Sequence, residues 1–321
     1  MVKKAVLIGL DWGSTSLRAF LIGEQGEVLE TRSSAAGAST LAGAPAFEQA
    51  LAQVVGDWQA LGLPMLACGM VGSKHGWREA AYATCPADVS ALAAQSVGAG
   101  LAIVPGLIHR PADAPPDVMR GEETQIVGAL ALHPQLAQDA CIVLPGTHSK
   151  WARVQAGRVT GFATHMTGEL YALLRTQSVL GRLMADGPAD EAAFVAGVDA
   201  ARDGADLGLA HQLFAVRTLG LTERWPATSL ADYLSGLLVG DELRAGLKAV
   251  IPAQAGIQSR ATILDSRLRG NDGAFALIGE PSLCARYATA FARFNVTAPL
   301  LLNNTAPTGL WTIATAMGLL Q

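Results

Sequence analysis

A short polar turn follows the first apolar run of the chain. The run ends at Asp11, and the turn continues through Gly13, Ser14 and Thr15. Phosphoryl transfer needs a metal ion to neutralise phosphate oxygens and donors to hold them. A carboxylate at the end of a buried strand can hold Mg²⁺, and Gly13 lets the backbone approach phosphate beside hydroxyl and N–H donors. The same residues also fit an ordinary hairpin with a polar turn. This turn alone therefore does not distinguish a phosphate-binding turn from an ordinary one.

A second turn of the same kind lies near the middle of the chain. Gly146 and Thr147 repeat the pattern, and His148 and Lys150 add donors or positive charge that suit phosphate. A single Gly-Thr turn occurs in proteins of many classes. Two such turns at matching places in two halves of a chain are harder to assign to chance. If the turns face each other, they would grip a polyphosphate from both sides.

The elements around the two turns follow one plan. Strands are predicted on both sides of each turn, at residues 4–11, 17–22 and 26–32 and again at 141–144, 151–154 and 158–164. Each set is a meander, whereas the first strand of a dinucleotide-binding fold leads directly into a helix. Further strands are predicted at residues 64–71, 101–105 and 275–279. Helices are predicted at residues 46–61, 88–95, 168–247 with breaks, 281–292 and 308–320.

The composition excludes several classes of protein. Half of the 321 residues are hydrophobic and 16% are charged, which predicts a sizeable core. The net charge of −4 argues against a nucleic-acid partner, because nucleic acids bind basic surfaces. The four cysteines lack metal-ligand spacing, and the chain shows neither a signal peptide nor an apolar run of about 18 residues. We therefore expect a cytoplasmic protein with reduced thiols and no membrane contact.

The pair of turns resembles the phosphate-1 and phosphate-2 loops of the superfamily of actin, hexokinase and heat-shock ATPases. The resemblance implies an α/β fold of two ribonuclease-H-like lobes, with mixed sheets flanked by helices and a cleft between the lobes. We expect the N-terminal lobe at residues 1–128 and the C-terminal lobe at residues 129–321. Much of the superfamily begins the second loop with Asp, whereas this chain has Leu144 and Pro145 there. Metal binding through a carboxylate of the second loop is therefore not implied.

A closer resemblance, over nearly the whole chain, is to the 2-dehydro-3-deoxygalactonokinase family. The matching segments are residues 11–18, 69–77, 120–125, 145–151, 166–170, 234–240 and 278–283. The resemblance implies ATP and Mg²⁺ as co-reactants. It implies transfer of the γ-phosphoryl group to the terminal 6-hydroxyl of 2-dehydro-3-deoxy-D-galactonate, a sugar acid of galactonate catabolism. The segment at residues 278–283 would contact adenosine through Gly279 and Ser282. For the assembly, a homodimer is one option.

The same resemblance gives roles to residues that would meet the sugar acid. Ser73, Lys74 and His75 follow a predicted strand, and we assign them to the acid because a carboxylate needs polar or charged donors. A solvated loop without a ligand is the alternative interpretation. Thr167 and Glu169 follow the second meander and would line the substrate site from the other lobe.

The segment that begins at Arg120 holds the candidates for the catalytic base. Glu122 or Glu123 would accept the proton of the sugar hydroxyl or orient that hydroxyl. Arg120 would bind the substrate carboxylate or stabilise the transferred charge. Acidic residues also favour a helix N-terminus for electrostatic reasons alone. Asp11 competes with the two glutamates for the role of base.

Residues 250–273 differ from their surroundings. They have no clean helical or strand period, and Arg260, Arg267 and Arg269 add a basic cluster to an acidic chain. The segment resembles the translation of a short repetitive DNA element of bacterial genomes. One interpretation is a tolerated surface loop, because each doubling of loop length costs only about 0.6 kcal/mol. The other is that the insertion damages the neighbouring nucleotide site.

Two other functions stay open at this point. A phosphohydrolase of the same superfamily would use the acidic residues 122–123 to activate water, and it would release phosphate without a sugar acceptor. A non-catalytic sugar-acid-binding protein, inactivated by the insertion, would bind the acid without turning over ATP. The sugar-acid kinase is our main hypothesis.

Overall fold

The computed structural model describes residues 4–96, 98, 100–250 and 274–320. The chain forms two compact units. The first unit comprises Met1–Ala140, Ala152–Phe162 and Leu302–Gln321, and the second comprises Cys141–Trp151 and Ala163–Leu301. The predicted insertion lies outside the described residues, apart from its first residue, which ends a helix.

The first unit is built on a five-stranded sheet with the strand order β3-β2-β1-β4-β6. Its strands are β1 (Ala5–Trp12), β2 (Leu17–Gly23), β3 (Val28–Ser34), β4 (Met65–Cys68) and β6 (Leu101–Ile103). The first three strands pair antiparallel, whereas β4 joins β1 and β6 joins β4 in parallel. The predicted meander and the edge position of its third strand are confirmed.

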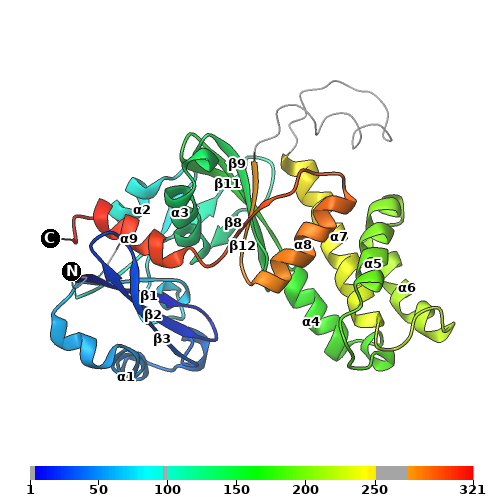
Figure 1. Cartoon of the computed structure of the whole chain (residues 1–321), viewed down its shortest axis with the longest axis horizontal. Coiled ribbons are helices and arrows are strands. Elements are labelled where there is room, and N and C mark those ends of the chain that lie inside the picture. The colour runs from blue at the N-terminus through cyan, green and yellow to red at the C-terminus, as the bar shows by residue number, and fades with distance from the viewer. Residues whose placement is uncertain (1–3, 97, 99, 251–273, 321) are drawn as a thin grey trace. The chain divides into compact units, whose positions relative to one another are not determined.

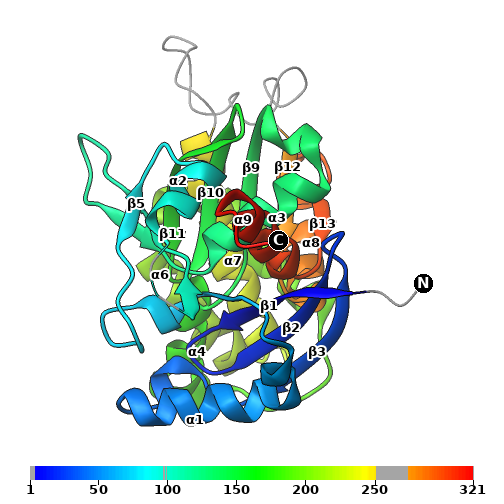
Figure 2. The same cartoon turned by 90° about the vertical axis from the view of Figure 1, so that its left-hand side faces the viewer.

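Helices cover both faces of this sheet. Figure 2 shows α1 (Ala44–Val55) and α9 (Ala306–Ala316) on opposite sides of β1 and β2. Alternate side chains of β1 pack with Phe47 and Trp58 in one core cluster. On the other face, Gly9 lies against Leu310 of α9. The predicted helix at 46–61 ends early and continues as the 3-10 turn η2 (Gly56–Leu61), because Gly56 takes a φ of 54°.

The rest of the first unit consists of short elements. A three-stranded sheet, which the sequence did not predict, contains β5 (Tyr82–Thr84), β7 (Gly106–His109) and β8 (Asp117–Met119). The helices are α2 (Val89–Gln95) and α3 (Glu122–Leu132), and the 3-10 turns are η1 (Ala38–Thr40), η3 (Met70–Gly72) and η4 (Pro134–Ala137). α9 packs along α3, and the Thr305 hydroxyl donates to the carbonyl of Gln125 at 2.6 Å. Because α9 belongs to this unit, the two units are not two consecutive segments.

The second sheet repeats the plan of the first. Its strand order is β11-β10-β9-β12-β13. The strands are β9 (Asp139–Leu144), β10 (Ser149–Gln155), β11 (Arg158–His165), β12 (Ala274–Ile278) and β13 (Leu300–Leu302). In both sheets three consecutive strands are followed by two strands from later in the chain, added beside the first. This repetition confirms the predicted α/β class with two ribonuclease-H-like halves.

Helices make up most of the second unit, and Figure 1 shows α5, α6 and α7 side by side. The helices are α4 (Thr167–Gln177), α5 (Glu191–Asp203), α6 (Leu209–Leu221), α7 (Leu230–Val250) and α8 (Pro281–Arg293), with 3-10 turns η5 (Gly181–Leu183) and η6 (Ala205–Leu207). The predicted helical stretch at 168–247 corresponds to α4 through α7. The breaks expected near Gly187 and at 221–228 are present, whereas a third break between α5 and α6, at η6 and Gly208, was not predicted. Within the described ranges, no helix combines the length and apolarity that a membrane crossing requires.

Candidate active site

In the first unit, two strand ends and a helix start come together. Asp11 near the end of β1 pairs with Cys68 at the end of β4. Gly121 precedes α3 with a φ of 110°, a conformation that favours glycine. A Cβ on Gly121 would lie 3.2 Å from the Cα of Gly69, the residue after β4. The predicted phosphate turn, the loop after β4 and the candidate bases are therefore neighbours.

The Asp11 carboxylate is largely buried and has a charged partner. Arg18 Nη2 donates to Asp11 Oδ2 at 2.6 Å. Burial raises the pKa of Asp11, and the nearby Arg18 guanidinium partly offsets that rise. Arg18 was not among the predicted site residues, although the hairpin register places it directly opposite Asp11. A strand pairing across a short turn is the signal that would have identified it.

The predicted phosphate-1 turn is held rigidly from outside. Ser14 and Thr15 are exposed, and Gly13 N donates to Ser16 O at 3.0 Å. The carbonyls of Gly13 and Ser14 accept the N–H groups of Ala38 and Ser39 at 2.9 and 3.0 Å. These bonds fix the turn, and its polar groups lie at the surface of the unit.

Two adjacent glutamates at the start of α3 lie in different environments. Glu123 is 1% exposed, and its carboxyl accepts Gly121 N at 2.6 Å and the Thr124 hydroxyl at 3.0 Å. Burial, with help from the charge of Glu122, raises the pKa of Glu123 to about 8. Glu122 is only partly buried, and it accepts Arg120 N at 3.0 Å.

The Arg120 guanidinium lies beneath the predicted substrate loop. Its Nη2 donates to Ala80 O at 2.7 Å, and its Cζ lies 4.3 Å from the centre of the Tyr82 ring. Nε and Nη1 are buried and have no hydrogen-bond partner among the described residues. A Cβ on Gly72 would lie 3.0 Å from Nη1, so the guanidinium touches the loop directly. Two unpartnered donors on a buried cation favour an anion beside them.

The substrate loop itself is open to solvent. Lys74 and His75 are exposed, and Ser73 is half-buried beside Gly72. Trp77, which closes the loop, stacks on Phe47 with ring centres 5.9 Å apart. The aromatic core therefore anchors the end of the loop and leaves its polar residues accessible.

In the second unit, the turn between β9 and β10 packs against the start of α4. A Cβ on Gly168 would lie 2.8 Å from the Cα of Thr147, so only a glycine permits this approach. Glu169 N donates to Thr147 O at 3.0 Å. The side chains of His148 and Glu169 form a short hydrogen bond between Nε2 and a carboxylate oxygen. Residues predicted for phosphate and for substrate thus come together here.

A buried network that the sequence did not predict supports the same turn. Gly146 N donates to Ser149 Oγ at 3.4 Å, and Ser149 Oγ lies 3.1 Å from the Tyr287 hydroxyl. The Tyr287 hydroxyl donates to Glu242 at 2.6 Å, and the Trp151 indole donates to the same carboxyl at 2.8 Å. Burial and the Glu242 charge raise the pKa of Tyr287. The network ties the turn to α7 and α8.

Three of the other predicted residues of the second unit lie close to this turn, and Ser282 lines a separate pocket. Lys150 is 6% exposed, and its ammonium donates to the Thr164 hydroxyl at 2.8 Å. Thr167 is buried at the start of α4. A Cβ on Gly279 would lie 3.5 Å from Pro145 O, so the β12–α8 junction touches the turn. Ser282 lines a pocket of about 380 Å³ between α5 and α8.

The described part of the chain offers few protein ligands for a metal ion. Within the described ranges, there is no group of three or more His, Cys, Asp or Glu side chains that could hold a metal ion. Mg²⁺ is commonly held by one or two carboxylates together with substrate phosphates. Asp11, the predicted ligand, supplies one carboxylate of this kind near the end of β1, and Arg18 Nη2 donates to its Oδ2 at 2.6 Å.

Two ribonuclease-H-like sheets, each with a glycine-containing polar turn on its first hairpin, define the actin/hexokinase class of two-lobed kinases and ATPases. The profile of the family described as 2-keto-3-deoxy-galactonokinase matches residues 11–313. The chain is 36% identical to the 2-dehydro-3-deoxygalactonokinase of Escherichia coli strain K12, over 97% of this chain and 98% of that protein. A solved structure from Sinorhizobium meliloti, described provisionally as a 2-dehydro-3-deoxygalactonokinase, is 32% identical with a TM-score of 0.79, and the match covers 97% of this chain and 99% of that one. The chain belongs to the 2-keto-3-deoxy-galactonokinase family.

Proposed function

We propose that the protein transfers the γ-phosphoryl group of ATP to the 6-hydroxyl of 2-dehydro-3-deoxy-D-galactonate. The observation that carries the proposal is the repeated strand order, with a polar turn at the first hairpin of each sheet. Two phosphate turns suit a polyphosphate such as ATP. Membership of the family supports the sugar acid as the acceptor. A catabolic reaction that consumes ATP is expected in the cytoplasm.

In this proposal, the two turns hold the phosphates of ATP. Gly13, Ser14 and Thr15 supply donors from the first unit, and Gly146 and Thr147 supply them from the second. The exposed positions of Ser14, Thr15 and Thr147 support these roles. Mg²⁺ bound with ATP would neutralise phosphate charge, and Asp11 would hold it, directly or through water.

Further residues of the second unit would orient the nucleotide. His148 would donate to a phosphate oxygen, and its hydrogen bond with Glu169 would fix the orientation of the ring. Lys150 would add positive charge close to the turn. Gly279 and Ser282 would lie beside adenosine, and the pocket next to Ser282 supports that assignment.

The acceptor would be bound mainly by residues of the first unit. Arg120 would pair with the substrate carboxylate, and its two unpartnered donors are the support for this role. Ser73, Lys74 and His75 would add donors around the acid, and Thr167 and Glu169 would contact its hydroxyl groups. Arginine suits a carboxylate because its planar fork can donate two parallel hydrogen bonds.

We assign the catalytic base to Glu122 rather than Glu123. A base must be ionised at the working pH and must reach the acceptor hydroxyl. Glu123 is almost fully buried, and a pKa of about 8 leaves it mostly protonated at neutral pH. Its contacts suit a different task, which is to fix the peptide of Gly121. Asp11 is already paired with Arg18.

Phosphorus NMR of the reaction mixture tests the proposal. Purified protein, ATP, Mg²⁺ and the sugar acid should yield ADP and a new phosphate monoester. Inorganic phosphate in place of the monoester would identify a phosphohydrolase. Binding of the acid without any conversion of ATP would identify a non-catalytic binding protein.

A further inference from the structure

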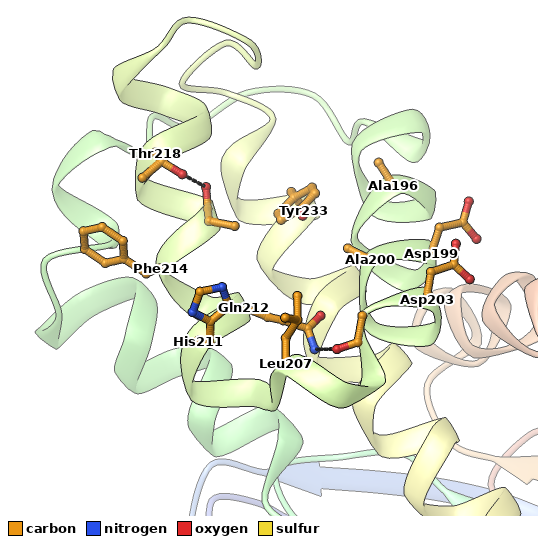
Figure 3. Close-up of a pocket in the computed structure, with 12 residues that line it drawn as sticks. Ala196, Asp199, Ala200, Asp203, Leu207, His211, Gln212, Phe214, Thr218 and Tyr233 are labelled. Atoms are coloured by element: carbon orange, nitrogen blue, oxygen red, sulfur yellow. Dashed lines mark hydrogen bonds between the residues drawn. The ribbon is translucent and has the colours of Figure 1, made fainter. Parts of the chain in front are cut away.

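A groove on the second unit lies apart from all the residues assigned above. Figure 3 shows it between α5 and α6, with Tyr233 of α7 behind it. The cavity has a volume of about 630 Å³. Small residues form much of its wall, namely Ala196, Ala200 and Gly204 from the α5 side and Ala215 from α6. A recess walled by alanines can accept a large side chain from outside.

Large apolar side chains project beside this recess. Leu207, Phe214 and Leu221 are 59%, 57% and 57% exposed, and they are the three most exposed large apolar residues of the part of the chain that the structure describes. Phe214 and Leu221 are seven residues apart on one face of α6, and Leu207 precedes that helix at the end of η6. In Figure 3 the Phe214 ring points outward from α6. Clustered exposed apolar residues mark a surface that another molecule covers.

The groove also contains a polar atom that is not satisfied. Gln212 is 6% exposed, and its Nε2 donates to Gly204 O at 2.9 Å. Its Oε1 is buried and has no hydrogen-bond partner within the described ranges. A buried acceptor without a partner costs free energy. A donor from another molecule could pair with Oε1 after a small adjustment of the amide and remove that cost.

The charges also differ between the two ends of α6. Asp206 lies just before the helix, where Asp203 is paired with Arg202 at 2.7 Å. Arg217 lies in the C-terminal half of α6, and Glu223 and Arg224 follow the helix. Two copies of α6 that run antiparallel would bring the acidic end of one near the basic end of the other. A two-fold axis produces this antiparallel arrangement, and it requires a face that carries both the projecting group and its recess.

We propose that this α5–α6 face (Ala196, Ala200, Leu207, Phe214, Ala215 and Leu221) binds a second copy of this chain about a two-fold axis. Phe214 of each copy occupies the groove of the other. The contact buries the exposed apolar stripe and fills the recess. It is independent of the proposed kinase activity, because it uses none of the residues assigned to ATP or the acid.

Sedimentation velocity over a wide range of protein concentration tests this dimer. The wild-type protein should sediment with twice the 33.2 kDa mass of the chain. Phe214→Glu changes the projecting group and Ala200→Glu fills the recess, and both should give the mass of a single chain. Leu61→Glu is the matched control, since Leu61 is 52% exposed in the first unit and its change should leave the dimer intact.

Circular dichroism confirms that each variant is folded before its mass is read. Hydrogen exchange of the wild-type protein gives a second readout, because dilution should increase exchange in α6 and leave α1 unchanged. A wild-type protein that is monomeric throughout would overturn the proposal and leave the groove to another occupant. A dimer mass that neither Phe214→Glu nor Ala200→Glu reduces would also overturn the proposal. The same holds for a wild-type mass that grows beyond two chains with concentration.

Discussion

The buried carboxyl of Glu123 makes a specific prediction about stability and pH. Its pKa is raised from 4.5 to about 8 in the folded protein. As the pH rises above 4.5, the unfolded chain releases this proton while the folded protein keeps it. The folded state then binds more protons than the unfolded state, so the free energy of unfolding falls with rising pH until about pH 8.

The size of the effect follows from the shift. Each unit of pKa difference corresponds to about 1.36 kcal/mol. Between pH 5 and pH 7.5 the Glu123 contribution should therefore lower the free energy of unfolding by about 3 kcal/mol. Glu123→Gln has no such proton, and its amide can keep the bond from Gly121 N while the Thr124 hydroxyl turns to accept. The variant should lose this pH dependence and be more stable than wild type at pH 7.5.

Urea unfolding at a series of pH values measures the difference between the two proteins. Glu48→Gln is the control, because Glu48 is exposed on α1 and its change should leave the pH profile unaltered. Infrared spectroscopy supplies a direct check, since the band of a protonated carboxyl at neutral pH should weaken in Glu123→Gln. Parallel curves of unfolding free energy against pH for wild type and Glu123→Gln would refute the reasoning, and Glu123 would again be a candidate base.

Three further variants test other parts of the site. Arg120→Lys should reduce kcat/KM for the sugar acid by about a hundredfold, the equivalent of about 3 kcal/mol from charged hydrogen bonds, with little change in the KM for ATP; an unaltered kcat/KM would remove Arg120 from acid binding. Asp11→Asn should lower kcat by orders of magnitude and keep the fold, and near-normal turnover at saturating Mg²⁺ would exclude Asp11 from the mechanism. Tyr287→Phe removes a donor from the buried Glu242, so it should lower the free energy of unfolding by about 1–3 kcal/mol. It should also raise the KM for ATP, because Tyr287 supports the β9–β10 turn through Ser149. A change in stability without a change in that KM would show that the network does not position the turn.

Much of the fold could be predicted because local signals agreed with it. The first strand of each meander is an apolar run that leads into a glycine-containing turn. Pro281 stands at the start of α8, where proline is favoured. The sheet of β5, β7 and β8 escaped prediction because its strands have three or four residues and little alternation. The place of α9 beside α3 is a tertiary contact between segments far apart in the chain, and no local pattern carries that information.

Site residues that lie on a single turn could be predicted from the sequence. Contacts that depend on the packing of distant segments could not. The polar turns at Gly13 and Gly146 stand out from the sequence. The pairing of Arg18 with Asp11 required the hairpin register. The buried Glu242 reaches Trp151 and Tyr287 only after α7 and α8 have packed on β10. The contrast between Glu122 and Glu123 also depends on burial, since adjacent residues of one type look alike in a sequence.

The central claim is that this chain phosphorylates one particular sugar acid. The most direct measurement is ADP release, coupled to a spectrophotometric readout, with ATP, Mg²⁺ and a panel of acceptors. The panel contains the 2-keto-3-deoxy acids derived from galactonate and from gluconate, together with simple hexoses. We predict turnover with the galactonate-derived acid and little with the hexoses, which lack the carboxylate for Arg120. A folded protein that releases no ADP with any of these acceptors, or that releases it equally without an acceptor, would contradict the account.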